Sequence, residues 1–175
     1  MVTDFEWLSP TRLTGLMAYL VAGIACLLRW IRCRKTDGLK GPFGLLAAIQ
    51  FLLLLDMAFD WRWKLHEFWM RKAMAQGVYD ERRGPQLLAI EALVLVLAAG
   101  SLWAVYKLRR RTGLALAVAG TMLSVGLWCC EAISYHFVDQ WFYRSVGGVM
   151  LVGLLWIVLA LTTSAGVWLD ARDNK

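Results

Sequence analysis

Three acidic side chains lie within long apolar stretches of the sequence: Asp56, Glu91 and Glu131. At 1.5 Å per residue, each lies about 5 to 6 Å inside the same end of the helix predicted to carry it. A carboxylate at the centre of a membrane span costs roughly 2.5 to 3.5 kcal/mol, so such groups normally face other helices or water and have partners. We therefore expect the three carboxylates to share one polar level.

More polar residues lie just outside that level, and they include both histidines of the protein. On a helix, His136 and Asp139 are three residues apart and lie on one face. Arg62 and Arg144 are further bases close by. We predict one outward-facing polar cluster, whose members are Asp56, Asp60, His66, Arg82, Arg83, Glu91, Glu131, His136 and Asp139.

Several kinds of site fit these residue types. An ion-pair network is one, because a charge buried without a partner destabilises the protein by more than an ion pair stabilises it. A divalent metal site is another, with His66, His136 and Asp139 as candidate ligands, since imidazole and carboxylate suit Zn, Mn or Fe. The sequence has no His-x-x-x-His or Glu-x-x-His spacing, and the nearby arginines would compete for the carboxylates.

Haem and a proton relay are weaker interpretations of the same residues. Haem ligation by His66 and His136 is disfavoured, because His66 projects farther from the membrane. A relay through the three intramembrane acids would need a second half, and toward the other side the sequence offers few polar residues. Those residues are Gln50, Ser101, Thr121 and Ser124.

Five apolar segments must position these residues. In a chain of 175 residues that is 59% hydrophobic, segments 13–31, 43–59, 87–106, 113–135 and 146–168 are long enough to cross a bilayer. The sequence thus predicts an all-α protein, a single membrane domain over 1–175 with five transmembrane helices. Residues 60–86 are expected to form a periplasmic cap that contains an amphipathic helix, broken near Asp60 or continuous with the second span, and ended at Gly77.

Lysine and arginine indicate the orientation of these spans. With the N-terminus outside and the C-terminus inside, eleven basic residues fall in inner segments and eight in outer ones. Basic residues near span ends are retained in the cytoplasm, so we predict this orientation. The net charge of +6 then indicates attraction to the inner leaflet, and nucleic-acid binding is rejected. The lipid bilayer and other membrane proteins are the expected partners.

A set of scattered residues between about 50 and 140 carries a family resemblance. The set consists of Trp61, Arg62, Leu65, His66, Gly77, Tyr79, Arg82, Arg83, Gln86, Ala132, Ile133, Ser134, His136 and Asp139. With these residues the chain resembles an uncharacterised group of small bacterial multi-pass inner-membrane proteins. The resemblance implies a bacterial inner membrane and no known activity.

Two classes of function remain compatible with these residues. The first is a non-enzymatic role, as an accessory or assembly subunit or as a binder of a small cation or lipid headgroup at the polar cluster. The alternative is a membrane-embedded enzyme that acts on an envelope lipid. In that alternative Arg82, Arg83 and Arg144 hold an anionic headgroup while His136 with Asp139 acts as base. No nucleophile elbow, phosphate loop or His-Glu-x-x-His motif supports the enzyme.

Overall fold

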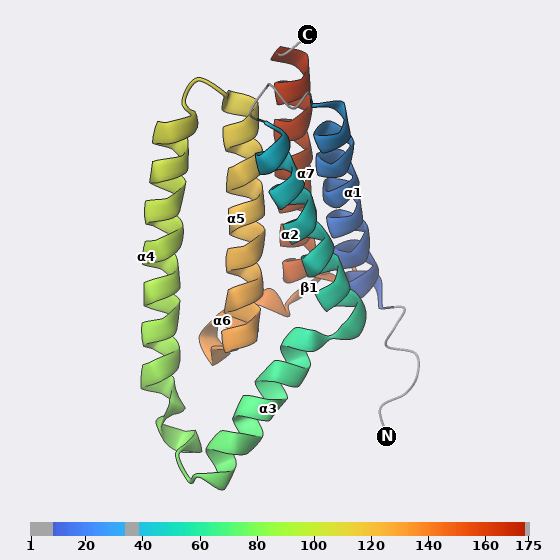
Figure 1. The fold of residues 1–175 in the computed structure, drawn as a ribbon. Helices are drawn as coiled ribbons and strands as arrows, with labels where there is room; N and C mark the ends of the chain where they lie inside the picture. The colour runs from blue at the N-terminus through green and yellow to red at the C-terminus, as the bar shows by residue number, and fades with distance from the viewer. Residues whose placement is uncertain (1–8, 34–38, 174–175) are drawn as a thin grey trace.

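Long helices dominate the structure, a computed structural model that describes residues 9–33 and 39–173. Short elements, namely a 3-10 helix, a two-turn helix and two short strands, join them at one end (Figure 1). In chain order the elements are α1 (Pro10–Arg32), α2 (Lys40–Phe59), α3 (Trp61–Ala75), the 3-10 helix η3 (Tyr79–Arg82), α4 (Arg83–Leu108), α5 (Thr112–Ile133), α6 (His136–Phe142), the strands β1 (Ser145–Val146) and β2 (Val149–Met150), and α7 (Leu151–Asp173).

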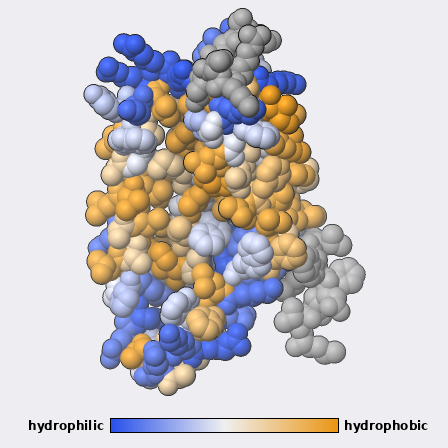
Figure 2. All heavy atoms as spheres, viewed as in Figure 1, coloured by the Kyte–Doolittle hydropathy of each residue, from blue (hydrophilic) through white to orange (hydrophobic). Residues whose placement is uncertain are grey.

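Within the described ranges, five helices are long and apolar enough to cross a membrane: α1, α2, α4, α5 and α7. Figure 2 shows hydrophobic residues across the middle of one face and hydrophilic residues gathered toward both ends. A bilayer favours this distribution, because its hydrocarbon core excludes charge and its two surfaces accept it. The predicted five-span, all-α membrane fold is confirmed.

All five spans differ from their predicted bounds by up to five residues, and the differences between the fourth and fifth spans have a structural cause. Residues 145–150, predicted in part as helix, form a small hairpin in which Ser145 pairs with Met150. Gly147 and Gly148 at its turn have φ of 61° and 84°, a conformation that glycine adopts without strain. The fifth span therefore begins at Leu151. The fourth ends at Ile133, since Ser134 takes the left-handed conformation with φ of 50°.

Helices α1, α2, α5 and α7 form the packed core. Small residues let α5 and α7 approach closely: a Cβ atom on Gly166 would lie 2.6 Å from the backbone oxygen of Gly113. At one end, the Arg29 guanidinium binds the Asp170 carboxylate at 2.7 Å and joins α1 to α7. Figure 1 shows α4 at the edge of the bundle, and only 6% of the residues in its most apolar stretch are buried.

The chain turns sharply between α2 and α3. Asp60 joins the two helices in the left-handed conformation, with φ of 54°. The sequence left open whether the helix breaks near Asp60 or continues from the second span, and the structure shows a break. Figure 1 shows α3 leaving the bundle diagonally. Gly77, with φ of 71°, follows the helix, and η3 leads into α4. Arg62 is the buried residue of α3, while its other side chains are exposed or half-buried.

The predicted inner basic residues gather at one end of the bundle. Figure 1 shows the C-terminal ends of α1, α4 and α7 beside the N-terminal ends of α2 and α5. Of the eleven basic residues assigned to this side, Arg34, Lys35 and Lys175 lie outside the described residues. The four cysteines are free thiols: Cys26, Cys33, Cys129 and Cys130.

We expect Gly166→Ala to lower the free energy of unfolding by roughly 1 to 3 kcal/mol, because its methyl group would press on the backbone of α5. Thermal unfolding in detergent measures the change. Gly41→Ala is the matched control, since a Cβ atom there meets nothing within 4 Å. Equal loss of stability in both variants would contradict close packing at Gly166.

Candidate functional site

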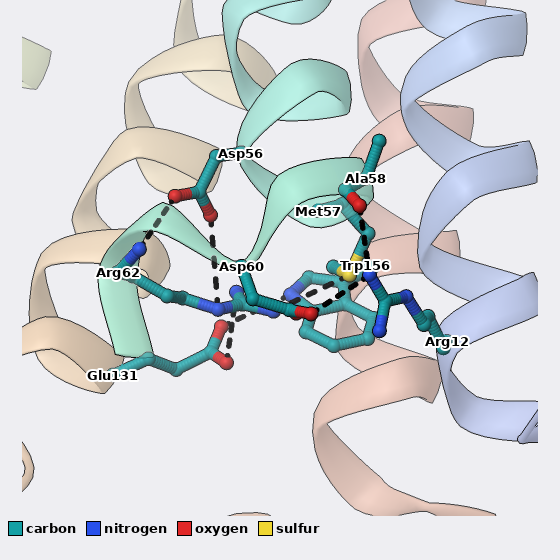
Figure 3. A network of polar contacts seen from close by, with 8 residues as sticks. All are labelled: Arg12, Asp56, Met57, Ala58, Asp60, Arg62, Glu131 and Trp156. Carbon is teal, nitrogen blue, oxygen red and sulfur yellow. Dashed lines mark hydrogen bonds and ion pairs between the residues drawn. The ribbon is translucent and has the colours of Figure 1, made fainter. Parts of the chain in front are cut away.

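A buried arginine links three helices at the end of the bundle where α2 meets α3 (Figure 3). The Arg62 side chain, only 5% exposed, places Nη1 3.0 Å from Glu131 Oε2 and Nε 3.7 Å from Asp56 Oδ2. Its backbone N–H donates a 2.9 Å hydrogen bond to Asp56 Oδ1. Both carboxylates therefore have the charged partner that burial demands. We call Arg62, Asp56 and Glu131 the buried triad.

The break at Asp60 places Arg62 in this position. Because α3 begins at Trp61 and departs at an angle, its first turn directs Arg62 back between α2 and α5 (Figure 3). From α7, Trp156 Nε1–H donates to Glu131 Oε1 at 3.2 Å. The Arg62 guanidinium lies 5.2 Å from the centroid of the same indole ring. Trp156 therefore contacts both the Glu131 carboxylate and the Arg62 guanidinium.

Arg12 fixes the break from the side of α1. Its Nη2 atom lies 2.9 Å from Asp60 Oδ2 and donates a 2.9 Å hydrogen bond to the carbonyl oxygen of Ala58. That carbonyl is among the last of α2, where no intrahelical N–H remains to satisfy it. A cation at a helix C-terminus is also favoured by the helix dipole. Arg12 therefore ties α1 to the α2–α3 turn.

Beside the buried triad lies an open pocket of about 920 Å³. Residues from α3, η3, the start of α4, the end of α5 and α6 form its walls. One group of lining residues is apolar and another is polar or charged. The polar group comprises His66, Tyr79, Arg82, Arg83, Gln86, Ser134, Tyr135, His136 and Asp139.

Hydrogen bonds hold the polar wall of this pocket together. Gln86 Nε2–H donates to the backbone oxygens of Ile133 and Ser134, at 3.1 and 3.2 Å, and joins α4 to the end of α5. The Ser134 hydroxyl donates to Asp139 Oδ2 at 2.7 Å. Burial raises the pKa of Asp139, and the Ser134 hydrogen bond lowers it in part. His136 Nε2 lies 2.9 Å from Gln140 Nε2.

The predicted single cluster separates into two sites. Asp56 and Glu131 both form ion pairs with Arg62, and Asp60 forms an ion pair with Arg12 at the neighbouring turn between α2 and α3. Five other predicted residues line the pocket instead: His66, Arg82, Arg83, His136 and Asp139.

Glu91 joins neither site. Its side chain is exposed on α4, and within residues 9–33 and 39–173 it forms no ion pair. Sequence spacing predicts its position along the helix but not its direction around the helix axis, and α4 turns its side chain away from the pocket wall. The expectation that three carboxylates share one polar cluster is therefore corrected to two.

The metal interpretation finds no support in this geometry. His66, His136 and Asp139 line one pocket, but among the described residues no group of three or more His, Cys, Asp or Glu side chains is placed to hold a metal ion. Ser134 is the partner of Asp139 here, and Gln140 is the partner of His136. These contacts direct Asp139 and His136 to neighbours in their own segment.

Sequence reasoning missed the importance of Arg62 and Trp156. It placed Arg62 among the bases outside the membrane, because residue spacing does not give the direction that the chain takes after Asp60. For Trp156 a clue existed: its indole lies in the middle of an apolar segment, as that of Trp128 also does, whereas most other tryptophans lie near span ends. An indole N–H buried that deeply needs an acceptor, and Glu131 supplies one.

Comparisons of the chain with protein-family models, with curated protein sequences and with solved structures found no match. The fold and the two sites define a multi-pass α-helical membrane protein with a buried ion-pair centre and an adjoining polar pocket.

We expect Arg62→Met to lower the free energy of unfolding by about 3 to 5 kcal/mol, because it leaves two buried carboxylates without their cation. Adding Glu131→Gln should recover part of this loss, since it removes one of those charges. Unfolding in detergent, followed by tryptophan fluorescence, measures both effects. The control is Arg71→Met, whose 3.6 Å pair with Glu67 is exposed and should contribute about 0.5 kcal/mol or less. An equally small effect at Arg62 would contradict the central role of the triad.

Asp139 predicts a specific pH dependence of stability. Its pKa is raised above the ordinary value of 3.8 in the folded protein, so the folded state keeps a proton that the unfolded chain has released. The free energy of unfolding should therefore fall as pH rises through the raised pKa. Asp139→Asn should remove that part of the slope in unfolding curves measured from about pH 3 to about pH 7, a range that brackets ordinary carboxyl titration. An unchanged slope would contradict the assignment.

Proposed function

We propose that this protein is a non-enzymatic membrane protein that binds the anionic headgroup of a lipid in the pocket between α3, η3, α4, α5 and α6. The observation that carries the proposal is the pocket itself, which has a volume of about 920 Å³ and two arginines and two histidines in its wall. That volume lies in the range of small-molecule sites. Guanidinium groups are the side chains best suited to phosphate, because they donate parallel hydrogen bonds.

The two walls of the pocket suit an amphiphile. Leu65, Trp69, Met70, Ile133 and Phe137 supply apolar surface next to the charged groups. An acyl chain can lie against such a wall while its headgroup stays among the charged residues. A free inorganic anion would gain nothing from this apolar surface. The composition of the walls therefore supports a lipid over a soluble phosphate.

One of the arginines is already oriented for binding. The Arg82 guanidinium lies 3.6 Å from the centroid of the Tyr79 ring, and both residues line the pocket. Stacking reduces the freedom that the long side chain would lose when it binds a headgroup. Against these cations the pocket wall carries one carboxylate, Asp139, which accepts a hydrogen bond from Ser134. The balance of charge favours an anionic ligand.

We propose further that the pocket faces the periplasm of a bacterial inner membrane. The other end of the bundle carries basic residues at the ends of its helices, which supports its placement on the cytoplasmic side. These residues include Arg29, Arg32, Lys40, Lys107, Arg109, Arg110, Arg111 and Arg172. In this orientation the N-terminus is outside, and α3 with η3 forms the periplasmic cap.

The enzyme alternative has less support from the pocket. It requires His136 and Asp139 to act as a pair, and Asp139 instead accepts a hydrogen bond from Ser134 while His136 contacts Gln140. A base must lie within hydrogen-bond reach of the proton that it removes. Lipid binding needs only the charges and the apolar wall that line the pocket, so we propose binding.

We expect the double substitution Arg82→Gln/Arg83→Gln to weaken binding of phosphatidylglycerol about tenfold or more, because charge-assisted hydrogen bonds to the phosphate are lost. Native mass spectrometry of the protein in nanodiscs of phosphatidylglycerol and phosphatidylcholine measures lipid retention. Arg144→Gln is the control: it removes a cation beside Trp141 that does not line the pocket. Inorganic phosphate, added separately, distinguishes binding of a lipid from binding of a free anion.

Two results would contradict the proposal. One is equal retention of the anionic and zwitterionic lipids by the unmodified protein. The other is an equal loss of binding in the pocket variant and in Arg144→Gln, which would indicate attraction by net charge alone.

A further inference from the structure

Helix α4 packs against the rest of the protein along one face only. Leu93 and Leu97 are half-buried on that face, and Ala104 is 3% exposed. A Cβ atom on Gly100 would meet the side chain of Met122, and one on Gly126 would meet that of Leu97. These contacts join α4 to α5. They leave the opposite face of α4 without a neighbour in the described part of the chain.

The opposite face carries a regular stripe of leucines. Leu88, Leu95 and Leu102 follow one another at intervals of seven residues and are 67%, 70% and 73% exposed. A seven-residue repeat keeps side chains on one line along a helix, as in helices that pack side by side. Lipid alone would accept any arrangement of apolar residues on this face.

Glu91 lies on the same stripe, three residues after Leu88 and four before Leu95. It is about 7 Å along the axis from the midpoint of α4, which places it within a hydrocarbon core of about 30 Å. Asp56 and Glu131, the other acids at comparable depth, are buried and bound to Arg62. No cation in the described chain pairs with Glu91. A carboxylate toward lipid is costly, so a partner that supplies positive charge would stabilise this face.

We propose that the face of α4 formed by Leu88, Glu91, Leu95 and Leu102 binds a transmembrane helix of another protein, and that this helix carries an arginine or lysine opposite Glu91. Charge complementarity selects this occupant. A lipid acyl chain cannot neutralise a carboxylate within the hydrocarbon core. A partner helix with one basic residue gains an ion pair where water is absent, together with packing against the leucines.

A second copy of this chain fits the face poorly. The sequence has no lysine or arginine between Arg12 and Arg29 in α1, after Lys40 in α2, or within α5. Helix α7 has none before Arg172, and α4 has none between Arg83 and Lys107. Two copies meeting at α4 would place carboxylate against carboxylate. The partner is therefore a different membrane protein, and this inference stands independently of lipid binding in the pocket.

Site-specific photo-crosslinking in native membranes tests the proposal. A photoreactive amino acid replaces Leu95 on the stripe or, as the matched control, Leu161 in the middle of α7, which is 60% exposed. We expect one protein adduct from position 95 and none from position 161. Mass spectrometry of the crosslinked peptide should place it in a transmembrane segment with an arginine or lysine within one helical turn.

Glu91→Gln should reduce the yield of this adduct about tenfold, because the ion pair is lost while size and shape remain. The melting temperature of the purified variant should stay unchanged, since Glu91 has no ion-pair partner in the described chain. Exchanging the charges, with Glu91→Lys here and the facing base changed to Glu in the partner, should restore the adduct. This rescue separates a direct contact from a general effect on folding or expression.

Three results would overturn the proposal. Position 95 could yield only lipid adducts, or only a dimer of this chain. A protein adduct could also form with equal yield in the Glu91→Gln variant, in which case the carboxylate has no part in recognition.

Discussion

Inside the bundle, Arg62 forms ion pairs with Asp56 and Glu131, and these contacts hold the surrounding helices in their positions. A guanidinium and two carboxylates lie buried in a bundle that lipid surrounds, where water cannot replace any of them. Each charge is tolerable only while the others remain in place. The triad therefore holds α2, the start of α3 and α5 in one arrangement, and Trp156 adds α7 to it. Apolar packing alone would fix this arrangement less specifically, because the helices are as apolar as the lipid.

The polar pocket depends on the same interaction. Arg62 is buried at the first turn of α3, so its ion pairs determine where the remainder of that helix leaves the bundle. That direction brings His66 and the apolar side chains of α3 opposite the ends of α5 and α6, and a cavity remains between them. The triad residues do not line the pocket themselves, but their ion pairs hold the helices that do, and the exposed arginines of η3 and α4 place positive charge in its wall.

Helix α4, unlike the four core helices, is mostly exposed. It contacts α5 through one narrow face and through Gln86, while most of its surface has no neighbour in the described part of the chain. An element held in this way can receive a partner without disturbing the core of α1, α2, α5 and α7. The proposed lipid binding at one end of α4 and the proposed helix binding along its outer face therefore do not exclude each other.

Residue counts along the chain were enough to predict five spans, a helix end near Gly77 and the positions of Asp56, Glu91 and Glu131 along their helices, because span length and distance along a helix follow from such counts. Residue counts did not show which of these acids meet in the folded protein. That outcome depends on the rotation of each helix about its axis and on the left-handed turn at Asp60, which brings Arg62 back into the bundle. Rotation is set by packing between segments far apart in the chain, so residue spacing within one segment contains no record of it.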